Sequence, residues 1–133
     1  MTVQKLEYRQ LEVGQQFPAV SFNLDSDSLA AYLKSTGELD SLYEGTGIVP
    51  PTAVAAWALI SLLEHVALPE GTIHLSQELQ CLSMATEGDT LNCRARVSRK
   101  QERGRLRLLD IEFDVVGKEG TLLISGKSSF NFP

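Results

Sequence analysis

The feature that most constrains this chain is a long apolar segment that begins after a double proline and ends before a single one. Residues 52–67 read TAVAAWALISLLEHVA. Proline is tolerated in the first turn of a helix and breaks a helix elsewhere, so this punctuation predicts a helix from Thr52 to Ala67. The segment is apolar on every side until Glu64 and His65. A helix without a polar face must be covered by other structure on most sides.

Four strand-like runs follow this helix, at residues 72–85, 90–98, 105–116 and 121–132. Each alternates apolar and polar residues, and turn signals rich in glycine separate the runs. The third run changes phase near Leu108, which predicts a β-bulge there. A long antiparallel meander after a fully apolar helix predicts an α+β fold, in which a strongly curved sheet wraps around that helix in a hotdog-like layout.

The chain before the apolar helix is predicted to hold an extended segment and a short helix. Residues 11–24 mix apolar and polar residues in an extended pattern, and Asp25 or Ser26 can cap a helix that ends near Gly37. No linker, low-complexity stretch or internal repeat divides the chain. We therefore expect residues 1–133 to form a single domain.

Composition and charge narrow the functional classes. Hydrophobic residues make up 43% of the chain and charged residues 22%, which is typical of a folded globular protein. The net charge of −5 argues against general binding to nucleic acid, because phosphates need a basic surface. The first residues, MTVQKLEYRQ, do not resemble a signal peptide, and no apolar run reaches the roughly 20 residues of a membrane span. We expect a cytoplasmic protein without a membrane partner.

The cysteines and histidines do not predict a metal site. Cys81 and Cys93 lack the spacing of a metal knuckle and are too few for a disulfide framework. Both lie in strand-like alternation, which favours buried free thiols. His65 and His74 form no recognisable ligand set with them. We expect neither a metal nor another cofactor.

The order of short helix, polar loop, buried helix and long antiparallel strands resembles a MaoC-like hydratase/dehydratase domain over nearly the whole chain. Residues 73–97 are similar to that family's second strand, its Gly-Asp turn and the strand that follows. The VPPT at residues 49–52 is similar to the helix start in the branch that resembles the N-terminal dehydratase-like domain of fatty acid synthase. The resemblance implies an acyl-CoA or acyl-carrier thioester as ligand. It also implies pairing with a second hotdog subunit, as a homodimer or a heterodimer.

The family's catalytic signature, Gly-Asp-x-Asn-Pro-x-His, is altered in this chain. The matching residues 37–43 read Gly-Glu-Leu-Asp-Ser-Leu-Tyr, so Glu38 replaces the catalytic aspartate and Tyr43 the catalytic histidine. Glu38 keeps a carboxylate that could take a proton. Tyr43, with a reference pKa of about 10, donates a hydrogen bond but is a poor acid–base partner at neutral pH. Altered or lost hydratase activity is therefore favoured, and the chain resembles the substrate-holding subunit of a pair.

The half of the site that binds the thioester does not depend on those two side chains. A helix that starts after Pro51 presents backbone N–H groups around Thr52 and Ala53, and the positive end of its dipole can polarise a thioester carbonyl. Trp57 could line an acyl tunnel or belong to the core. An ordinary buried helix start remains the alternative, because every helix has such an end.

Basic residues are concentrated in one stretch of the sequence. Arg94 and Arg96 fall on the polar face of their strand, where guanidinium groups could bind the phosphates of coenzyme A. A solvated charged face, balanced by nearby acids, is the alternative. Seven of the 12 basic residues lie in this stretch: Arg94, Arg96, Arg99, Lys100, Arg103, Arg105 and Arg107.

Two enzymatic hypotheses stand beside thioester binding. The chain could be an active (R)-specific enoyl-CoA hydratase or 3-hydroxyacyl dehydratase, with Glu38 as base and Tyr43 as hydrogen-bond donor. It could also be an acyl-CoA thioesterase in which Glu64 activates water. In the structural alternative, Glu38 is a solvated loop acid, Tyr43 a packing residue and Glu64 a helix end that reaches solvent.

Overall fold

The structure is a computed structural model that describes residues 4–36, 47–64 and 66–133. The helices among these residues are α1 (Ser26–Thr36) and α2 (Pro51–Leu63), with 3₁₀ turns η1 (Tyr8–Gln10) and η2 (Lys118–Gly120). The strands are β1 (Gln4–Lys5), β2 (Val20–Asn23), β3 (Ile48–Val49), β4 (Val66–Ala67), β5 (Ile73–Cys81), β6 (Ala85–Thr86), β7 (Thr90–Arg103), β8 (Leu106–Val116) and β9 (Leu122–Phe132). No helix among the described residues is long and apolar enough to cross a membrane.

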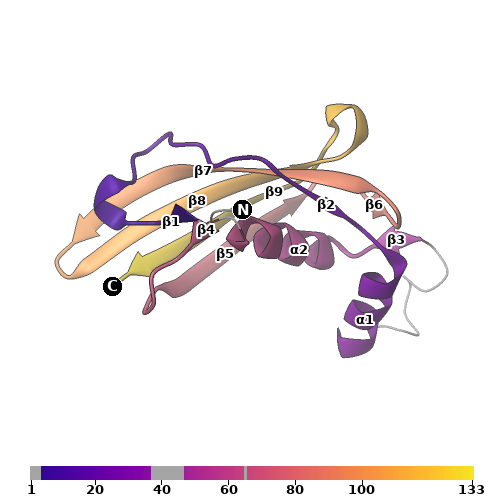
Figure 1. Cartoon of the computed structure of the whole chain (residues 1–133), viewed down its shortest axis with the longest axis horizontal. Helices are drawn as coiled ribbons and strands as arrows, with labels where there is room; N and C mark the ends of the chain where they lie inside the picture. Colours follow the sequence, from indigo (N-terminus) through magenta and orange to yellow (C-terminus); the bar gives the residue numbers. More distant parts are fainter. Residues whose placement is uncertain (1–3, 37–46, 65) are drawn as a thin grey trace.

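Five antiparallel strands form one curved sheet, in the order β2-β7-β8-β9-β5. Helix α2 lies under the concave face of this sheet, while α1 stands at one end (Figure 1). Two small pairs lie outside this sheet: β1 runs parallel to β4, and β3 runs antiparallel to β6. The predicted curved sheet around one apolar helix is confirmed.

Helix α2 begins one residue before the predicted start and ends four residues before the predicted end. Pro50 is its N-cap, and the carbonyl of Pro50 accepts hydrogen bonds from the N–H groups of Ala53 and Val54. After Leu63 the chain becomes β4, because pairing with β1 satisfies its backbone and buries Val66 at 1% exposure. The apolar pattern alone could not separate this short buried strand from a last helical turn.

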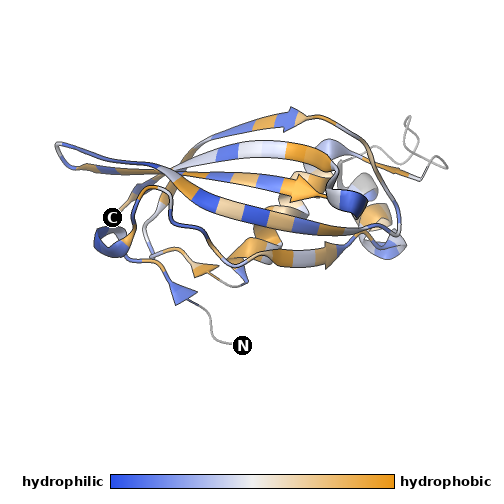
Figure 2. Cartoon of the chain, turned by 90° about the horizontal axis from the view of Figure 1, so that it is seen from above, coloured by the Kyte–Doolittle hydropathy of each residue, from blue (hydrophilic) through white to orange (hydrophobic). Residues whose placement is uncertain are grey.

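The sheet turns one side of each central strand toward α2. Along β7, Leu91, Cys93, Ala95 and Val97 are buried against the core, and the residues between them face the opposite, outer surface. Figure 2 shows the resulting alternation of hydropathy along the strands as seen from the outer side. This alternation places polar side chains on the outer face and the hydrophobic core between the sheet and α2.

The sequence predicted a β-bulge near Leu108 of β8, but the bulge lies in the neighbouring strand β7. The register of β7 and β8 shifts between Val97 and Arg99, so Ser98 of β7 is the extra residue. Strand β8 itself stays regular through this stretch, and Leu106 and Leu108 fall on its outer face. The change of phase in the sequence therefore reflects apolar residues on the outer face and not a break in the backbone of β8.

Strand β5 forms one edge of the sheet, and a bulge changes which of its residues face α2. The register shifts between His74 and Ser76, so the predicted alternation holds only beyond Leu75. Ile73, predicted on the core side, is 56% exposed. Cys81, predicted to be buried, is also exposed, because no strand covers this edge within the described chain.

The hairpin of β7 and β8 is longer than predicted. Strand β7 continues five residues past Ser98 to Arg103, although these residues are polar, because each pairs with a residue of β8. Gly104 and Arg105 make the two-residue turn, and Gly104 has the positive φ of 59° that favours glycine in such hairpins. The hairpin projects past α2 at one end of the sheet (Figure 1).

Replacing Gly126 with alanine is expected to destabilise the fold. A Cβ at Gly126 of β9 would lie 2.4 Å from Cζ of Phe113, whose side chain is fully buried. Overpacking of this kind costs about 1–3 kcal/mol, measured as the free energy of unfolding in urea. Gly117→Ala is the matched control, because its Cβ would lie at an ordinary 3.4 Å from Leu123. Equal stability of the two variants would contradict the expected clash.

Candidate functional site

The start of α2 is the first candidate site, and it offers fewer backbone donors than predicted. Pro51 has no N–H, and the N–H of Ala53 donates to the Pro50 carbonyl at 3.0 Å. The N–H of Thr52 has no backbone acceptor among the described residues. Ala53 is fully buried, whereas Thr52 is exposed. The double proline therefore leaves Thr52 as the amide that could meet a ligand here.

Tyr32 of α1 adds a hydroxyl to this helix start, which the sequence did not indicate. Its Oη lies 2.7 Å from Oγ1 of Thr52. Its ring meets Trp57 edge-on, with centroids 6.1 Å apart at an interplanar angle of 64°. Trp57 is partly buried and packs against the hydrophobic core. The aromatic position in the apolar stripe of α1 was visible in the sequence, but its contact across two helices was not.

Helix α1 is fixed at its N-terminus by Asp25, as predicted for a capping residue. The Asp25 carboxylate accepts hydrogen bonds from the N–H of Ser28 at 2.7 Å and from its hydroxyl at 2.9 Å. These bonds, the backbone one first, lower the pKa of Asp25 from its usual value. The cap supports the helix that brings Tyr32 to Thr52.

The predicted catalytic residues Glu38 and Tyr43 lie outside the described residues. Their role as replacements for an aspartate–histidine pair stays a prediction. The described chain stops at α1 before them and resumes at Gly47 after them.

A second candidate site, which the sequence did not indicate, is an apolar pocket beside the second half of α2. It has a volume of about 90 Å³, several times the 10–15 Å³ that one water needs. The ring of His74 stacks on Phe130 at its wall, with centroids 4.9 Å apart. The hydroxyl of Ser128, only 1% exposed, donates to Oε1 of Gln77. The lining residues are Leu6, Leu59, Leu62, Leu63, Val66, Leu68, His74, Ile111, Ser128 and Phe130.

The two candidate sites lie along the same helix. Leu59 follows Thr52 by seven residues, which corresponds to roughly 10 Å at the helical rise of about 1.5 Å per residue. The pocket wall is almost entirely hydrocarbon, whereas the helix start carries hydroxyl groups and the Thr52 amide, which has no backbone acceptor among the described residues. A ligand with a polar group at Thr52 and an apolar chain along α2 fits this arrangement.

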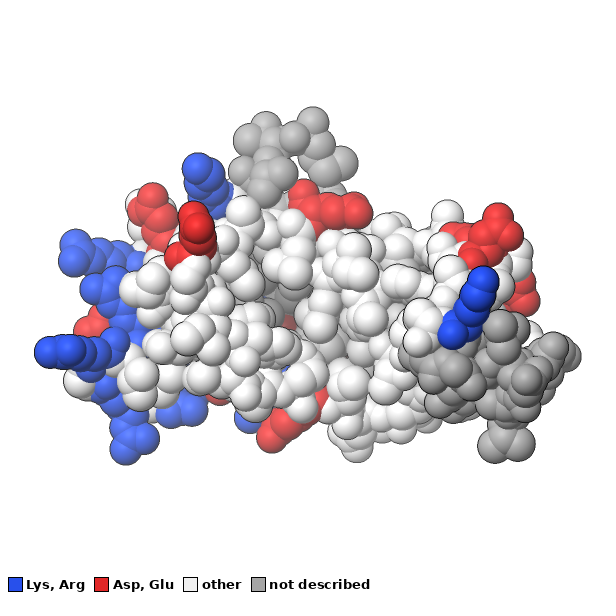
Figure 3. Space-filling view, turned by 90° about the horizontal axis from the view of Figure 1, so that it is seen from below, with Lys and Arg blue, Asp and Glu red and all other residues white. Residues whose placement is uncertain are grey.

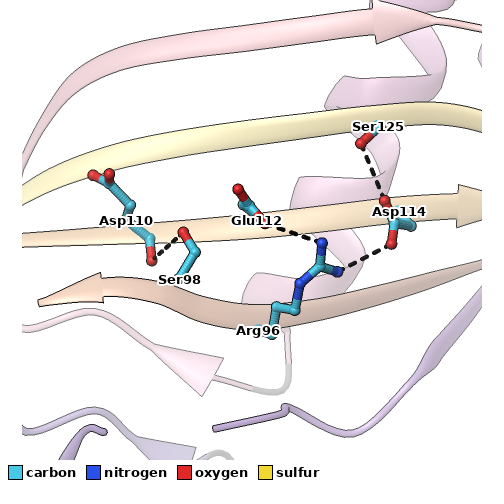
Figure 4. A network of polar contacts seen from close by, with 6 residues as sticks. All are labelled: Arg96, Ser98, Asp110, Glu112, Asp114 and Ser125. Atoms are coloured by element: carbon cyan, nitrogen blue, oxygen red, sulfur yellow. Dashed lines mark hydrogen bonds and ion pairs between the residues drawn. The ribbon is translucent and has the colours of Figure 1, made fainter. Parts of the chain in front are cut away.

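Arg94 and Arg96 lie on the outer face of the sheet, on the side opposite α2. Arg96 is held by two carboxylates, with Nη2 at 3.0 Å from Glu112 and Nη1 at 3.0 Å from Asp114 (Figure 4). The hydrogen bond to Asp114 contributes most to the raised pKa of Arg96. Ser125 donates to the other oxygen of Asp114 at 3.1 Å.

This geometry separates two groups of residues that the sequence analysis assigned to one ligand. Within one chain, the sheet lies between Arg94 and Arg96 on its outer face and Thr52 and Trp57 on the helix side. A phosphate at Arg96 would compete with both carboxylates. Arg94 is exposed beside an outer pocket of about 500 Å³. Phosphate binding at Arg94 and Arg96 stays a prediction.

Glu64, the residue that a thioesterase hypothesis needs, lies at the opposite end of α2 from Thr52. It is the exposed C-cap residue, and its N–H donates to the carbonyl of Ile60. Twelve residues separate it from Thr52, roughly 18 Å along the helix. Within one chain, Glu64 is therefore too far away to activate water at a carbonyl bound by Thr52.

Comparisons with known proteins show which fold this arrangement belongs to. R-hydratase PhaJ1 from Pseudomonas aeruginosa superposes with a TM-score of 0.79 at 22% identity, over 98% of this chain and 88% of that chain. The (R)-hydratase from A. caviae, involved in PHA biosynthesis, gives a TM-score of 0.77 at 22% identity, over 94% and 99% of the two chains. The HadBC (3R-hydroxyacyl-ACP dehydratase) complex from Mycobacterium tuberculosis gives 0.69 at 15% identity, over 90% and 96%.

Comparison by sequence is less informative. No family model matches this chain, and no curated protein matches it. The identities to the solved structures are too low to transfer an activity, but the superpositions extend over nearly the whole chain. The chain has the hotdog fold.

Cys93 is expected to make stability fall in alkaline solution. Burial, followed by the charge of Asp114, raises the pKa of its thiol to about 11 from a usual value of 9.0. Above about pH 9 the unfolded thiol loses its proton while the folded one keeps it, so the free energy of unfolding falls until about pH 11. The loss is about 2–3 kcal/mol. Unfolding in urea across this range should show a slope that Cys93→Ala reduces; parallel profiles would contradict the assignment.

Proposed function

We propose that this chain is a MaoC-like hotdog protein that binds an acyl thioester, and that it serves as the non-catalytic or atypical subunit of an enoyl-thioester hydratase/dehydratase. The observation that carries the proposal is the apolar pocket along α2, about 10 Å from a helix start with two hydroxyl groups and an amide, that of Thr52, without a backbone acceptor in the described chain. The hotdog fold, shared with two (R)-hydratases, supports it.

The helix start supplies the polar half of the proposed site. The carbonyl oxygen of the thioester would accept a hydrogen bond from the N–H of Thr52, where the positive end of the α2 dipole also favours negative charge. The Tyr32 and Thr52 hydroxyls already bond to each other, so one of them can turn to a ligand while the other keeps its place. Acyl-CoA is the thioester to test first.

The apolar pocket supplies the other half. An acyl chain that leaves the carbonyl at Thr52 would run along α2 past Trp57 and end among Leu59, Leu62 and Phe130. Because this lining is hydrocarbon, each buried methylene favours binding by about 0.8 kcal/mol. The modest volume favours short acyl chains.

A second hotdog subunit is part of the proposal. Strand β5 leaves its outer backbone edge unpaired within the described chain, and apolar side chains surround that edge. The face seen from below in Figure 3 is largely uncharged across its middle. The exposed apolar residues of α2, β5 and the segment after β5, 42–56% exposed, are Ile60, Leu63, Ile73, Leu75, Leu79, Leu82 and Met84. The HadBC complex is a precedent for pairing between hotdog chains.

The catalytic alternative rests on Glu38 and Tyr43. In an active (R)-specific hydratase, Glu38 would take a proton from water and Tyr43 would donate a hydrogen bond. A tyrosine exchanges its proton poorly at neutral pH, so we favour binding with altered or lost hydration activity. The thioesterase alternative, with Glu64, is less well supported because of its distance from Thr52.

Filling the pocket should shorten the acyl chain that binds. In Leu59→Phe, the larger ring would occupy the space beside α2, so octanoyl-CoA should bind about tenfold more weakly while butanoyl-CoA is little affected. The fluorescence of Trp57, the only tryptophan, reports binding. Val13→Phe, at an exposed position that does not line the pocket, is the control. If Leu59→Phe weakens the binding of octanoyl-CoA and butanoyl-CoA equally, the acyl chain does not lie in this pocket.

An activity assay on the isolated, unchanged chain tests whether Glu38 acts as a base. Hydration of 2-enoyl-CoA by the isolated chain should be slow, and Glu38→Gln should leave the rate unchanged if Glu38 is not a base. A rate that falls a hundredfold or more in Glu38→Gln, with unchanged Trp57 titrations, would establish the active-hydratase alternative instead. Release of the free thiol of coenzyme A from acyl-CoA, lost in Glu64→Gln, would establish the thioesterase alternative.

A charge at the β5 edge should separate the subunits. Leu75 is 53% exposed beside the free edge, so Leu75→Asp would place a carboxylate in the proposed interface. We expect a dimer for the unchanged chain and a monomer for Leu75→Asp in size-exclusion chromatography with light scattering. Val13→Asp, 63% exposed elsewhere, should remain a dimer. A monomeric unchanged chain would point to a different partner subunit, to be tested by co-expression.

A further inference from the structure

The charged side chains of this acidic chain are unevenly distributed, and one end of the molecule is basic. Figure 3 shows lysine and arginine side chains gathered at the end where the β7–β8 hairpin lies. The acidic residues at the same end are fewer: Glu7, Glu12, Glu70, Glu102 and Asp110. We define the basic end by seven of the chain's 12 lysines and arginines: Lys5, Arg9, Arg99, Lys100, Arg103, Arg105 and Arg107.

Three of these seven residues already have structural partners. Lys100 donates to the Leu11 carbonyl at 2.9 Å and lies 4.8 Å from the centre of the Tyr8 ring. Arg99 lies 3.9 Å from the carboxylate of Asp110. Arg107 donates to the Pro133 carbonyl at 3.2 Å. These contacts hold the N-terminal segment and the end of β9 against the hairpin.

The arginines at the tip of the hairpin have no such role. The side chains of Arg103 and Arg105 are exposed and make no hydrogen bond or ion pair with any described residue. Between Arg105 and Arg107, the side chain of Leu106 is 46% exposed. An apolar side chain beside two guanidinium groups without partners, on a projecting turn, resembles the centre and rim of a protein interface.

The shape of this end favours a large partner over a small anion. The recess beneath the hairpin, about 560 Å³, has Lys5, Arg9 and Arg107 on its wall, but also Glu7 and Glu70. A phosphate in the recess would meet carboxylates as well as cations. The turn itself carries Arg103, Arg105 and Leu106 exposed to solvent, with Glu102 as the carboxylate next to it in the strand, so a broad acidic surface could contact the two arginines together.

We propose that the basic end is a docking surface for an acidic protein. The proposal rests on the proposed function for the partner's identity: the protein would be the carrier that presents the acyl thioester on a flexible arm. The free arginines would steer the carrier by charge, and Leu106 would contact an apolar side chain on it.

Pairing through β5 would place this docking surface close to the proposed thioester site. Strand β5 starts at the basic end, where Ile73 pairs with Asn131, and finishes at the opposite end, where Cys81 pairs with Ile124. Helix α2 starts at that opposite end, because β3, just before it, pairs with β6, just before β7. Antiparallel pairing of two copies about a twofold axis would bring the basic end of one copy to the same end as the α2 start of the other.

Binding of an acidic acyl carrier protein without its arm tests the docking step alone. Arg103→Gln/Arg105→Gln should weaken its Kd at least about tenfold, measured by fluorescence anisotropy at low salt. Lys34→Glu, on exposed α1 at the other end, changes the net charge by the same two units and should change the Kd less than about twofold. Equal weakening in both variants, or no binding by the unchanged chain, would overturn the proposal.

Two further measurements distinguish this proposal from coenzyme A binding and from membrane binding. Acyl-CoA titrations of Trp57 fluorescence should be unchanged in Arg103→Gln/Arg105→Gln; a loss there would assign the arginines to coenzyme A phosphates and overturn the proposal. Phosphatidylglycerol vesicles should not bind; binding that depends on the two arginines would assign the tip to a membrane and also overturn it. If the carrier docks but no thioester binds, docking stands and the proposed function fails.

Discussion

The structure depends on the burial of a helix that has almost no polar face. Alanines at positions 53 and 58 of α2 are fully buried, and their small side chains let the helix axis come close to the sheet. The sheet must curve to cover such a helix, and its strands contain bulges at Ser98 and Leu75 that increase local twist. At Gly126, the absence of a side chain leaves room for the buried ring of Phe113.

One chain does not complete this burial. Ile60 and Leu63 of α2 remain 55% and 47% exposed, on the side where the sheet ends with β5. An exposed sheet edge beside apolar side chains is unfavourable in water unless another strand or chain covers it. The same apolar helix that fixes the fold therefore creates the need for a partner. The apolar pocket beside Leu59 and Leu62 lies next to this uncovered side, so a partner would also enclose a ligand there.

The sequence predicted the parts of the fold that follow from local periodicity. The start of α2 depends on proline and lies within one residue of the prediction, and the buried positions of β7 depend on alternation and are as predicted. The end of α2, the bulge at Ser98 and the exposure of Cys81 depend on which strand lies alongside, which periodicity does not encode. The contact of Tyr32 with Thr52 and the pocket around Ser128 likewise join distant segments. Residues 37–46, which hold Glu38 and Tyr43, lie outside the described chain.

Cross-strand register also decides what each arginine of the basic stretch can do. Arg96 pairs with Glu112 and lies beside Asp114, so both neighbours on β8 are carboxylates and its charge is neutralised. Seven residues further along the same strand, Arg103 pairs with Leu106 across the turn and meets no carboxylate in the described chain. The two residues look alike in the sequence, as members of one basic run. In the fold, Arg96 ties two strands together on the outer face, whereas Arg103 is free to meet a partner. A count of basic residues therefore overstates the cationic surface along the sheet, because neighbours across the strands neutralise Arg96 and Arg99 but not Arg103.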